Sequence, residues 1–168
     1  MPSDDLFAER RRKIDELAAR GIPSYGVDFV PSATMDEARL RLNTYEAEHP
    51  GADVDAADRP VVAVAGRIMQ LRDLGGAAFA HVEDESGRLQ AWFRADRDGG
   101  AHAMVGLLDL GDIVGITGPM TRTRRGEPSV LADTVTLLVK ALLGHKVGDT
   151  VDVQSPGGAR QIKIVKIN

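Results

Sequence analysis

"AAFAHVEDESGRLQAWF", residues 77–93, is the stretch that decides the fold. Its apolar and polar residues alternate on both sides of a polar run, EDESG, at residues 83–87. This pattern predicts two antiparallel strands joined by a tight turn, each with one apolar face and one outward face. The outward face then consists of three cross-strand pairs: Glu83 with Arg88, His81 with Gln90, and Phe79 with Trp92.

The stretches on either side of this hairpin complete a barrel. Residues 61–71, "VVAVAGRIMQL", predict a long strand before it, and residues 96–110, "DRDGGAHAMVGLLDL", predict a short helix after it. Residues 111–142 predict two more strands, which meet at Arg125 and Gly126. Three strands, a helix and two strands are the order of a five-stranded Greek-key barrel of the oligonucleotide-binding (OB) type. We therefore expect a mainly β protein with helices (α+β).

The segment before the barrel predicts helices and a linker. Residues 4–22 have the apolar spacing of an amphipathic helix, and the basic run "RRRK" within it predicts a solvated face. A shorter helix is expected at about residues 35–42, with Ser32 or Thr34 as its cap. Residues 43–60 are acidic and rich in Ala and Pro, which predicts an exposed linker.

The segment after the barrel predicts a second hairpin. Residues 148–167, "GDTVDVQSPGGARQIKIVKI", alternate on both sides of SPGG, which can form the turn. An isolated hairpin is only marginally stable in water, so it needs a surface to pack on or a partner for its edge. The expected parts are an N-terminal helical extension and linker at 1–60, a barrel at 61–142 and a hairpin at 143–168.

The outward face of the first hairpin suits single-stranded nucleic acid. Aromatic rings such as Phe79 and Trp92 stack on unpaired bases at roughly 1–3 kcal/mol per base. Gln90 can donate and accept hydrogen bonds together, so it can read a Watson–Crick edge. Glu127 is suited to accept a hydrogen bond from a base. The phosphate backbone would follow Arg67, Arg72 and the loop "TRTRR", residues 121–125, and Arg88 belongs to the same outward face.

A structural alternative accounts for the same residues. The N-terminal helix could cover Phe79 and Trp92, because apolar residues on a wet face usually have a structural reason. The loop "TRTRR" would then be a solvated hairpin tip. The sequence pattern leaves this alternative open.

Composition excludes several other classes of function. The chain of 168 residues has no cysteine, which removes disulfides and thiolate chemistry and fits a reducing cytoplasm. Its four histidines, at 49, 81, 102 and 145, lack the spacing of metal ligands. No run is apolar and long enough to span a membrane, and the N-terminus lacks the apolar core of a signal peptide. A net charge of −4 restricts any nucleic-acid site to a local patch.

Several motifs in order carry a resemblance to a known family. They are "RRRKIDELAARGI", "VAVAGRIM", "GRLQAWF", "LDLGDIVGITG", "RTRRGEPSV" and "VTLLVKAL". Through them, residues 6 to about 142 resemble the N-terminal anticodon-binding region of bacterial class II lysyl-tRNA synthetases. The resemblance implies that Phe79 stacks on the central uridine of an anticodon, and that Gln90 and Glu127 read anticodon bases.

The chain also departs from that family. Leu71 and Gly76 stand where the family usually carries lysines, and Pro128 stands where it has a strand-forming residue. Fewer phosphate contacts predict weaker binding with a flatter salt dependence. Residues 144–168 are too few for an ATP site, an amino-acid pocket and an active-site sheet, so we expect a non-catalytic protein without a cofactor or metal.

The C-terminal tail resembles a second family. Residues 141–167, "ALLGHKVGDTVDVQSPGGARQIKIVKI", are similar to the end of bacterial Gre-type transcript-cleavage factors, in which this segment belongs to a small domain that docks on RNA polymerase. The chain therefore changes its resemblance within the few residues around "KALLG" at 140–144.

We expect a cytoplasmic protein that binds tRNA, or other single-stranded RNA, and assists an aminoacyl-tRNA synthetase or a tRNA-modifying enzyme in trans. The alternative is a protein-interaction module that acts through its tail on RNA polymerase. A homodimer is compatible with either. The expected nucleic-acid-binding residues are Arg67, Arg72, Phe79, His81, Arg88, Gln90, Trp92 and Glu127.

Overall fold

The hairpin at residues 77–93 has the expected register. In the computed structural model, which describes residues 2–141, 150–155 and 158–163, β2 (Ala77–Glu83) pairs antiparallel with β3 (Arg88–Arg94). Glu83 faces Arg88, His81 faces Gln90, and Phe79 faces Trp92, so all three predicted pairs are confirmed. The Asp84 carboxylate holds the turn, because its Oδ1 accepts hydrogen bonds from the main-chain N–H groups of Ser86 and Gly87.

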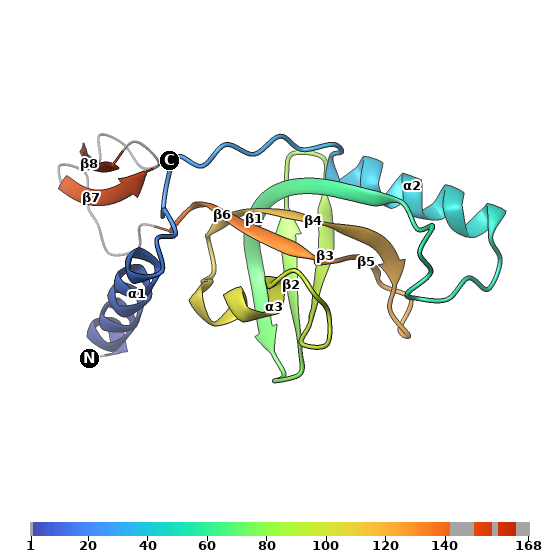
Figure 1. Ribbon diagram of the computed structural model, residues 1–168, viewed down its shortest axis with the longest axis horizontal. Coiled ribbons are helices and arrows are strands. Elements are labelled where there is room, and N and C mark those ends of the chain that lie inside the picture. Colours follow the sequence, from blue (N-terminus) through green and yellow to red (C-terminus); the bar gives the residue numbers. More distant parts are fainter. Residues whose placement is uncertain (1, 142–149, 156–157, 164–168) are drawn as a thin grey trace.

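A closed barrel forms around this hairpin (Figure 1). The other barrel strands are β1 (Val61–Asp73), β4 (Ile113–Arg122), β5 (Pro128–Leu131) and β6 (Thr134–Val139). The strand order is β1-β2-β3-β5-β4, and β1 also pairs with β4, which closes the ring. β5 runs parallel to β3, whereas the other pairs are antiparallel. This arrangement confirms the predicted OB fold, with α3 (Ala101–Met104) and the 3-10 turn η1 (Val105–Leu107) between β3 and β4.

The last barrel strand is broken, so the prediction of two strands within residues 111–142 was wrong: the described part of this segment has three, β4, β5 and β6. At Ala132 the chain leaves β4, and the Ala132 N–H donates to the main-chain oxygen of Trp92 on β3. The next N–H, that of Asp133, donates back to Thr117 on β4. Where the chain passes from β5 to β6, its main chain comes close to Gly118 on β4. Only glycine fits there, because a Cβ on Gly118 would lie 1.9 Å from the Leu131 oxygen.

The second helix is longer than expected. α2 (Met35–Glu48) begins at Thr34, whose hydroxyl accepts from the Glu37 N–H in a capping box. It does not end at Leu42 as predicted, because Tyr45 continues the buried stripe at helical spacing. Buried residues of α2 share one face: Met35, Ala38, Leu42 and Tyr45.

Residues 43–48 of the predicted linker or exposed loop belong to α2, and residues 49–60 form a loop without helix or strand that is fixed to the barrel. Arg59 is buried, with 6% of its surface exposed. Its guanidinium donates to the main-chain oxygens of Ala52 and Asp53 within the segment and to that of Met120 on β4. The Tyr45 hydroxyl also donates to Asp58, at 2.6 Å. One arginine therefore gathers the segment's carbonyl groups against the barrel.

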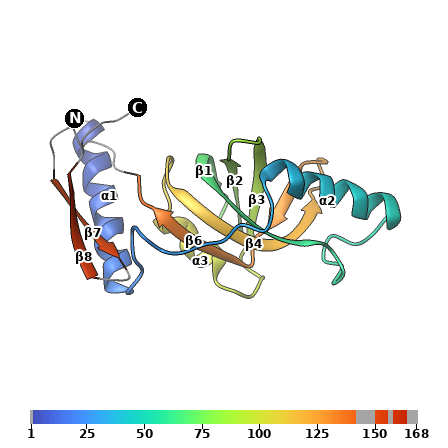
Figure 2. The ribbon, with the colours of Figure 1, turned by 90° about the horizontal axis from the view of Figure 1, so that it is seen from above.

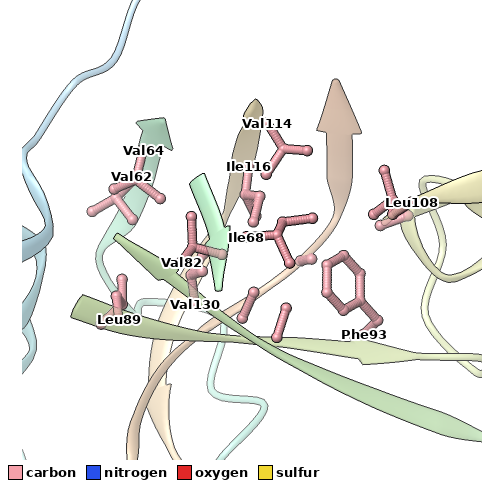
Figure 3. Packing of buried hydrophobic residues seen from close by; sticks show 14 of the residues in the cluster. Val62, Val64, Ile68, Val82, Leu89, Phe93, Leu108, Val114, Ile116 and Val130 are labelled. Carbon is pink, nitrogen blue, oxygen red and sulfur yellow. The ribbon is translucent and has the colours of Figure 1, made fainter. Parts of the chain in front are cut away.

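The core fills the inside of the barrel (Figure 3). Each strand contributes its inward residues, and Leu108 closes one end. Fully buried aliphatic and aromatic side chains stabilise a fold by about 1.5–3 kcal/mol each. The largest members of this core include Ile68, Phe93, Leu108 and Ile116.

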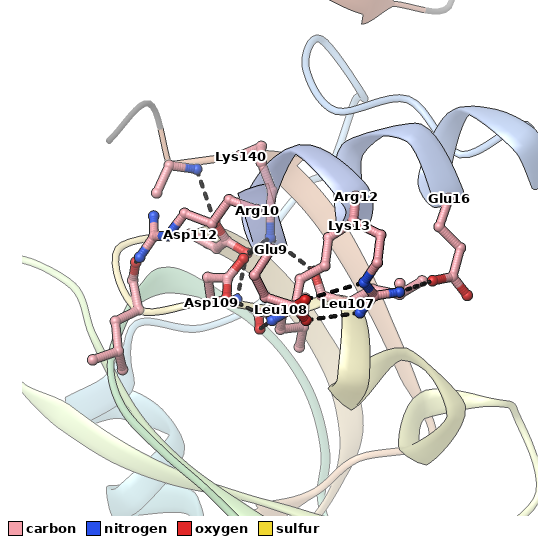
Figure 4. A network of polar contacts seen from close by, with 12 residues as sticks. Glu9, Arg10, Arg12, Lys13, Glu16, Leu107, Leu108, Asp109, Asp112 and Lys140 are labelled. Atoms are coloured by element: carbon pink, nitrogen blue, oxygen red, sulfur yellow. Dashed lines mark hydrogen bonds and ion pairs between the residues drawn. The ribbon is translucent and has the colours of Figure 1, made fainter. Parts of the chain in front are cut away.

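The N-terminal helix docks on the barrel through a buried charge network (Figure 4). α1 (Pro2–Ala19) places Lys13 within 2.6 Å of Asp109, and Lys140 at the end of β6 lies 2.7 Å from Asp109 and 2.8 Å from Asp112. Lys140 and Asp112 have 2% and 0% of their side chains exposed. Burial raises the pKa of Asp109, but hydrogen bonds from Lys13 and Lys140 outweigh it and hold that pKa below its ordinary value.

This docking also corrects the prediction that "RRRK" is a solvated face. Lys13 belongs to the buried network, and Arg10 is 8% exposed, with its Nη2 donating to the Leu110 oxygen. Arg12 remains on the surface, where it pairs with Glu9 and Glu16. The helix thus has one charged face turned inward and another turned to solvent.

The C-terminal hairpin forms as expected. β7 (Thr150–Ser155) pairs antiparallel with β8 (Gly158–Lys163) in a two-stranded sheet of its own. It lies at the α1 end of the molecule, beyond the end of the barrel (Figures 1 and 2). The middle of the predicted turn, residues 156–157, lies outside the described residues.

Replacing Lys140 tests how strongly the charge network holds the fold together. Lys140→Met leaves Asp112 buried without its ammonium partner, so we expect the free energy of unfolding to fall by about 3–5 kcal/mol. Urea unfolding measures the change. Arg12→Met is the matched control, because an exposed ion pair contributes about 1 kcal/mol or less. Equal effects of the two substitutions on the free energy of unfolding would contradict a stabilising role of the buried charge network.

Candidate nucleic-acid interface

Cross-strand pairing arranges the outward side chains of β1, β2, β3 and β5 in rows. Directly opposite residues in a sheet share a face, so each row runs across the strands. The rows are Arg67–Glu83–Arg88, then Gln70–His81–Gln90–Ser129, then Arg72–Phe79–Trp92–Leu131. We call this surface the outer face. It holds seven of the eight residues expected from the sequence, and Glu127 directly precedes β5.

A β-bulge places both arginines of β1 on the outer face. Arg67 and Arg72 are an odd number of positions apart, so a regular strand would send them to opposite faces. The pairing between β1 and β2 shifts register between Ile68 and Gln70, which leaves Met69 as the extra residue. After this shift Arg72 faces Phe79, and Gln70 faces His81. The bulge also exposes Met69.

The aromatic row is a partly exposed stack. The rings of Phe79 and Trp92 lie 5.9 Å apart with an interplanar angle of 18°. The guanidinium of Arg72 lies 5.9 Å from the Phe79 ring, and that of Arg94 lies 5.5 Å from the Trp92 ring. Hydrogen bonds to Asp96 and Asp55 raise the pKa of Arg94, which keeps this cation charged.

The N-terminal helix does not bury this stack. α1 packs against η1, and both Phe79 and Trp92 keep part of their surface exposed. The structural alternative for the two aromatic residues is therefore wrong. Their rings are available beside an open cavity instead.

The middle row connects two expected base-reading residues. Gln90 donates from Nε2 to the Ser129 hydroxyl at 3.1 Å, and this hydroxyl donates to the main-chain oxygen of Glu127 at 3.1 Å. Ser129 is fully buried, whereas Glu127 is exposed. The Glu127 N–H donates to the Thr123 hydroxyl, which fixes the loop before β5. Hydrogen bonds therefore fix the main chain of Glu127, which carries the exposed carboxylate.

A cavity of about 410 Å³ opens beside these rows. Its polar lining includes four residues of the outer face, Gln70, Arg72, His81 and Gln90, and its apolar lining is Met69, Leu71, Phe79 and Leu110. Met69 and Leu110 are exposed large apolar side chains, with 43% and 51% of their surface accessible. The cavity therefore combines an apolar wall with hydrogen-bonding groups, as nucleobase sites do.

Sequence reasoning missed part of this lining. Gln70 and Met69 could not be placed because only the bulge decides the face on which they lie. Leu110 comes from the loop before β4, which is distant in sequence. Ser129 carried a usable signal, because it lies two residues after Glu127 on a predicted strand.

Two polar atoms at the outer face are buried without a hydrogen-bond partner in the described part of the chain. They are Nδ1 of His81 and Nε1 of Trp92. Buried polar groups in native proteins are usually paired, so each unpaired one needs an explanation. Both atoms belong to side chains next to the Phe79 and Gln90 positions.

The arginines of the candidate site differ in their hydrogen bonds and ion pairs to other residues of the protein. Arg88 pairs with Glu83 at 2.6 Å, and Arg67 donates to the Gly111 oxygen. In the basic loop, Arg122 pairs with Glu46 of α2. Arg124 and Arg125 are exposed at the tip of the same loop. Arg72, Arg124 and Arg125 are therefore more accessible than Arg122, which is half-buried and paired.

Among the described residues there is neither a metal-binding cluster nor a membrane-spanning helix. Residues 2–141 and the two strands after them contain no group of three or more His, Asp or Glu placed to hold a metal ion. Within the same ranges, no helix has both the length and the hydropathy needed to cross a membrane.

Comparisons with known proteins agree with this geometry. Residues 62–138 match the family described as an OB-fold nucleic acid binding domain. Residues 135–168 match the family described as transcription elongation factor, GreA/GreB, C-term. The two matches overlap at residues 135–138 in β6, just before the stretch at 140–144 where the sequence changes its resemblance.

The similar curated proteins are lysine–tRNA ligases. The one from Dehalococcoides mccartyi is 37% identical over 144 residues, which are 85% of this chain and 28% of that protein. The one from Anaeromyxobacter sp. is 36% identical over 164 residues, 96% of this chain and 31% of that protein. The one from Staphylococcus haemolyticus is 42% identical over 142 residues, 83% of this chain and 28% of that protein. The chain thus spans less than a third of the length of these relatives.

The strand topology defines the class of fold: residues 62–138, which match the OB-fold nucleic acid binding family, form an OB barrel. Over most of its own length, the chain is similar in sequence to part of the lysine–tRNA ligases named above. The resemblances read from the sequence, to lysyl-tRNA synthetases and to the end of Gre factors, are both confirmed.

Two phenylalanines on opposite faces of the sheet provide a test of this geometry. Phe93 is fully buried, so we expect Phe93→Ala to lower the free energy of unfolding by about 3–5 kcal/mol. Phe79→Ala removes one partner of a partly exposed stack, which is worth about 0.5–1.5 kcal/mol. It should also change the emission of Trp92, the only tryptophan in the chain. Chemical unfolding followed by fluorescence measures both, and a large loss for Phe79→Ala would contradict the outer face.

Proposed function

We propose that the barrel binds tRNA through a U-rich anticodon loop. Phe79 stacks on a base of the loop, Gln90 and Glu127 read base edges, and Arg72 with the tip of the basic loop positions the phosphates. His81 and Trp92 complete the surface, and Arg67 and Arg88 flank it. The protein serves an aminoacyl-tRNA synthetase or a tRNA-modifying enzyme in trans and performs no aminoacylation of its own.

The observation that carries this proposal is the stack of Phe79 and Trp92 beside Gln90 on an open face of the barrel. A stacking surface alone would bind any single strand. A neighbouring amide that can donate and accept adds the means to distinguish bases. The similarity to proteins named as lysine–tRNA ligases supports tRNA as the ligand.

The apolar cavity wall favours a bound base over a bound phosphate. Leu71 stands at a position where the resembled family usually carries a lysine, and it lines the cavity together with Met69 and Leu110. An apolar wall contributes packing and no counterion release. We therefore expect base contacts to supply a larger share of the affinity here than phosphate contacts do.

Binding of anticodon stem-loops tests the proposal directly. We expect a stem-loop with the UUU anticodon to bind more tightly than a stem-loop that has the same stem and a scrambled loop. Phe79→Ala should weaken UUU binding by about 5- to 150-fold, the loss of one stacked base. Quenching of Trp92 fluorescence follows the titration, because this tryptophan lies in the stack. Equal binding of every loop, unchanged by Phe79→Ala, would overturn anticodon recognition.

The salt dependence of binding tests the phosphate contacts. Each phosphate neutralised on a single strand contributes about 0.7 to the slope of log K against log salt concentration. Arg124→Ala and Arg125→Ala should each lower that slope by about this amount. Arg122→Ala is the control: its pairing with Glu46 predicts lower stability and an unchanged slope. If only Arg122→Ala lowered the slope, the RNA phosphates would not contact Arg124 and Arg125 at the loop tip.

The tail supports a second candidate function. Residues 135–168 match the C-terminal part of GreA/GreB elongation factors, and residues 150–163 include a two-stranded sheet with no further strand among the described residues. Such a sheet can add a partner's strand to its edge. Under this candidate the tail binds RNA polymerase and the barrel is a scaffold. Co-purification separates the two: tRNA and synthetases favour the first, polymerase subunits the second.

A further inference from the structure

Ser129 lies where the two proposed base-reading residues meet. It is the first of the three residues that β5 pairs with β3, counted from the end of the basic loop, and it stands directly opposite Gln90. Its side chain is fully buried, so it does not itself contact a ligand in solution. It contacts Gln90 through its hydroxyl and Glu127 through the same group.

The single hydroxyl proton fixes the direction of these hydrogen bonds. The main-chain oxygen of Glu127 can only accept, so the proton of Ser129 points toward it. That oxygen also accepts from the Thr123 N–H at 3.1 Å, and with two lone pairs it is then fully used. The Ser129 oxygen is left as an acceptor toward Gln90.

The side-chain amide of Gln90 is oriented as a result. Its Nε2 donates to Ser129 at 3.1 Å, and the opposite orientation would place Oε1 against an oxygen that has no proton to offer. Oε1 is therefore directed away from Ser129, and Gln90 lines the cavity beside Phe79. A base that enters the cavity therefore meets a hydrogen-bond acceptor, Oε1 of Gln90.

We infer that Ser129 is a positioning residue that sets the base preference of Gln90, an inference that rests on the proposed function. An oriented Oε1 accepts from a base whose ring nitrogen carries hydrogen, N3–H of uracil or N1–H of guanine. Cytosine and adenine present an unprotonated ring nitrogen at that place, which repels Oε1. The site therefore selects uracil over the pyrimidine of the same size, cytosine.

Removal of the hydroxyl tests this role. The probes are a UUU stem-loop and three loops in which one uridine is replaced by cytidine. We expect wild-type protein to bind UUU about tenfold more tightly than the most disfavoured of these loops, the effect of one hydrogen bond. Ser129→Ala frees the Gln90 amide to rotate, so this ratio should fall to about twofold. Ser129→Thr keeps a hydroxyl and should restore the wild-type ratio.

A matched control separates positioning from stability. Ser24 is a buried serine away from the outer face, and Ser24→Ala should leave the ratio unchanged. Should Ser129→Ala fail to fold, Ser129→Thr and Ser129→Val make the same comparison, because only the threonine keeps the hydroxyl in a side chain of that shape. A merely structural role of Ser129 would weaken binding of all loops equally.

The outcomes distinguish this inference from the proposed function. Wild-type preference for UUU that survives Ser129→Ala would overturn the role of Ser129 and leave anticodon recognition standing. Equal binding of all four loops by the wild-type protein would overturn both. A ratio that falls with Ser129→Ala and returns with Ser129→Thr supports both.

Discussion

The parallel pairing of β3 with β5 is the constraint on which the rest of the structure depends. It closes the barrel, and closure buries the inward residues of every strand in one core. The same pairing brings Ser129 opposite Gln90 and carries the loop that ends at Glu127 to the outer face. Closure therefore serves stability and the candidate site with the same few residues. A barrel that opened at this seam would lose its core and its base-reading pair together.

The remaining elements attach to the barrel by different forces. α2 covers it with an apolar stripe, and Arg59 fixes the following segment by hydrogen bonds to main-chain oxygens. α1 instead docks through Lys13 and Lys140 on either side of Asp109. Lys140 directly precedes the residues where the resemblance passes from one family to the other. This charge network therefore joins α1 and the end of β6 through Asp109 and Asp112.

The fold was predictable where period-two alternation and turn chemistry agree, and less so where tertiary contacts decide. The hairpin at 77–93 gave the right register because a slip by one residue would bury Phe79 and expose Ala78. The bulge at Met69 left no such signal, so the alternation of the sequence could not show that Arg67 and Arg72 share one face. The length of α2 depends on burial of Tyr45, and the order of the acidic segment depends on Arg59; both contacts are distant in sequence. Ser129 has a sequence signal in its spacing from Glu127, but its contact with Gln90 is defined only once β3 is placed beside β5.

The central claim is that single-stranded RNA binds on the outer face of β1, β2, β3 and β5. Amide chemical shifts of ¹⁵N-labelled protein, followed during titration with a UUU anticodon stem-loop, test it most directly. We predict that the large shifts fall on residues 69–72, 79–81, 90–92 and 127–129, and that α1 and Lys140 stay unchanged. Chemical-shift changes confined to α1 or to the C-terminal hairpin would contradict the claim. The absence of any change at an excess of stem-loop over protein would contradict it as well.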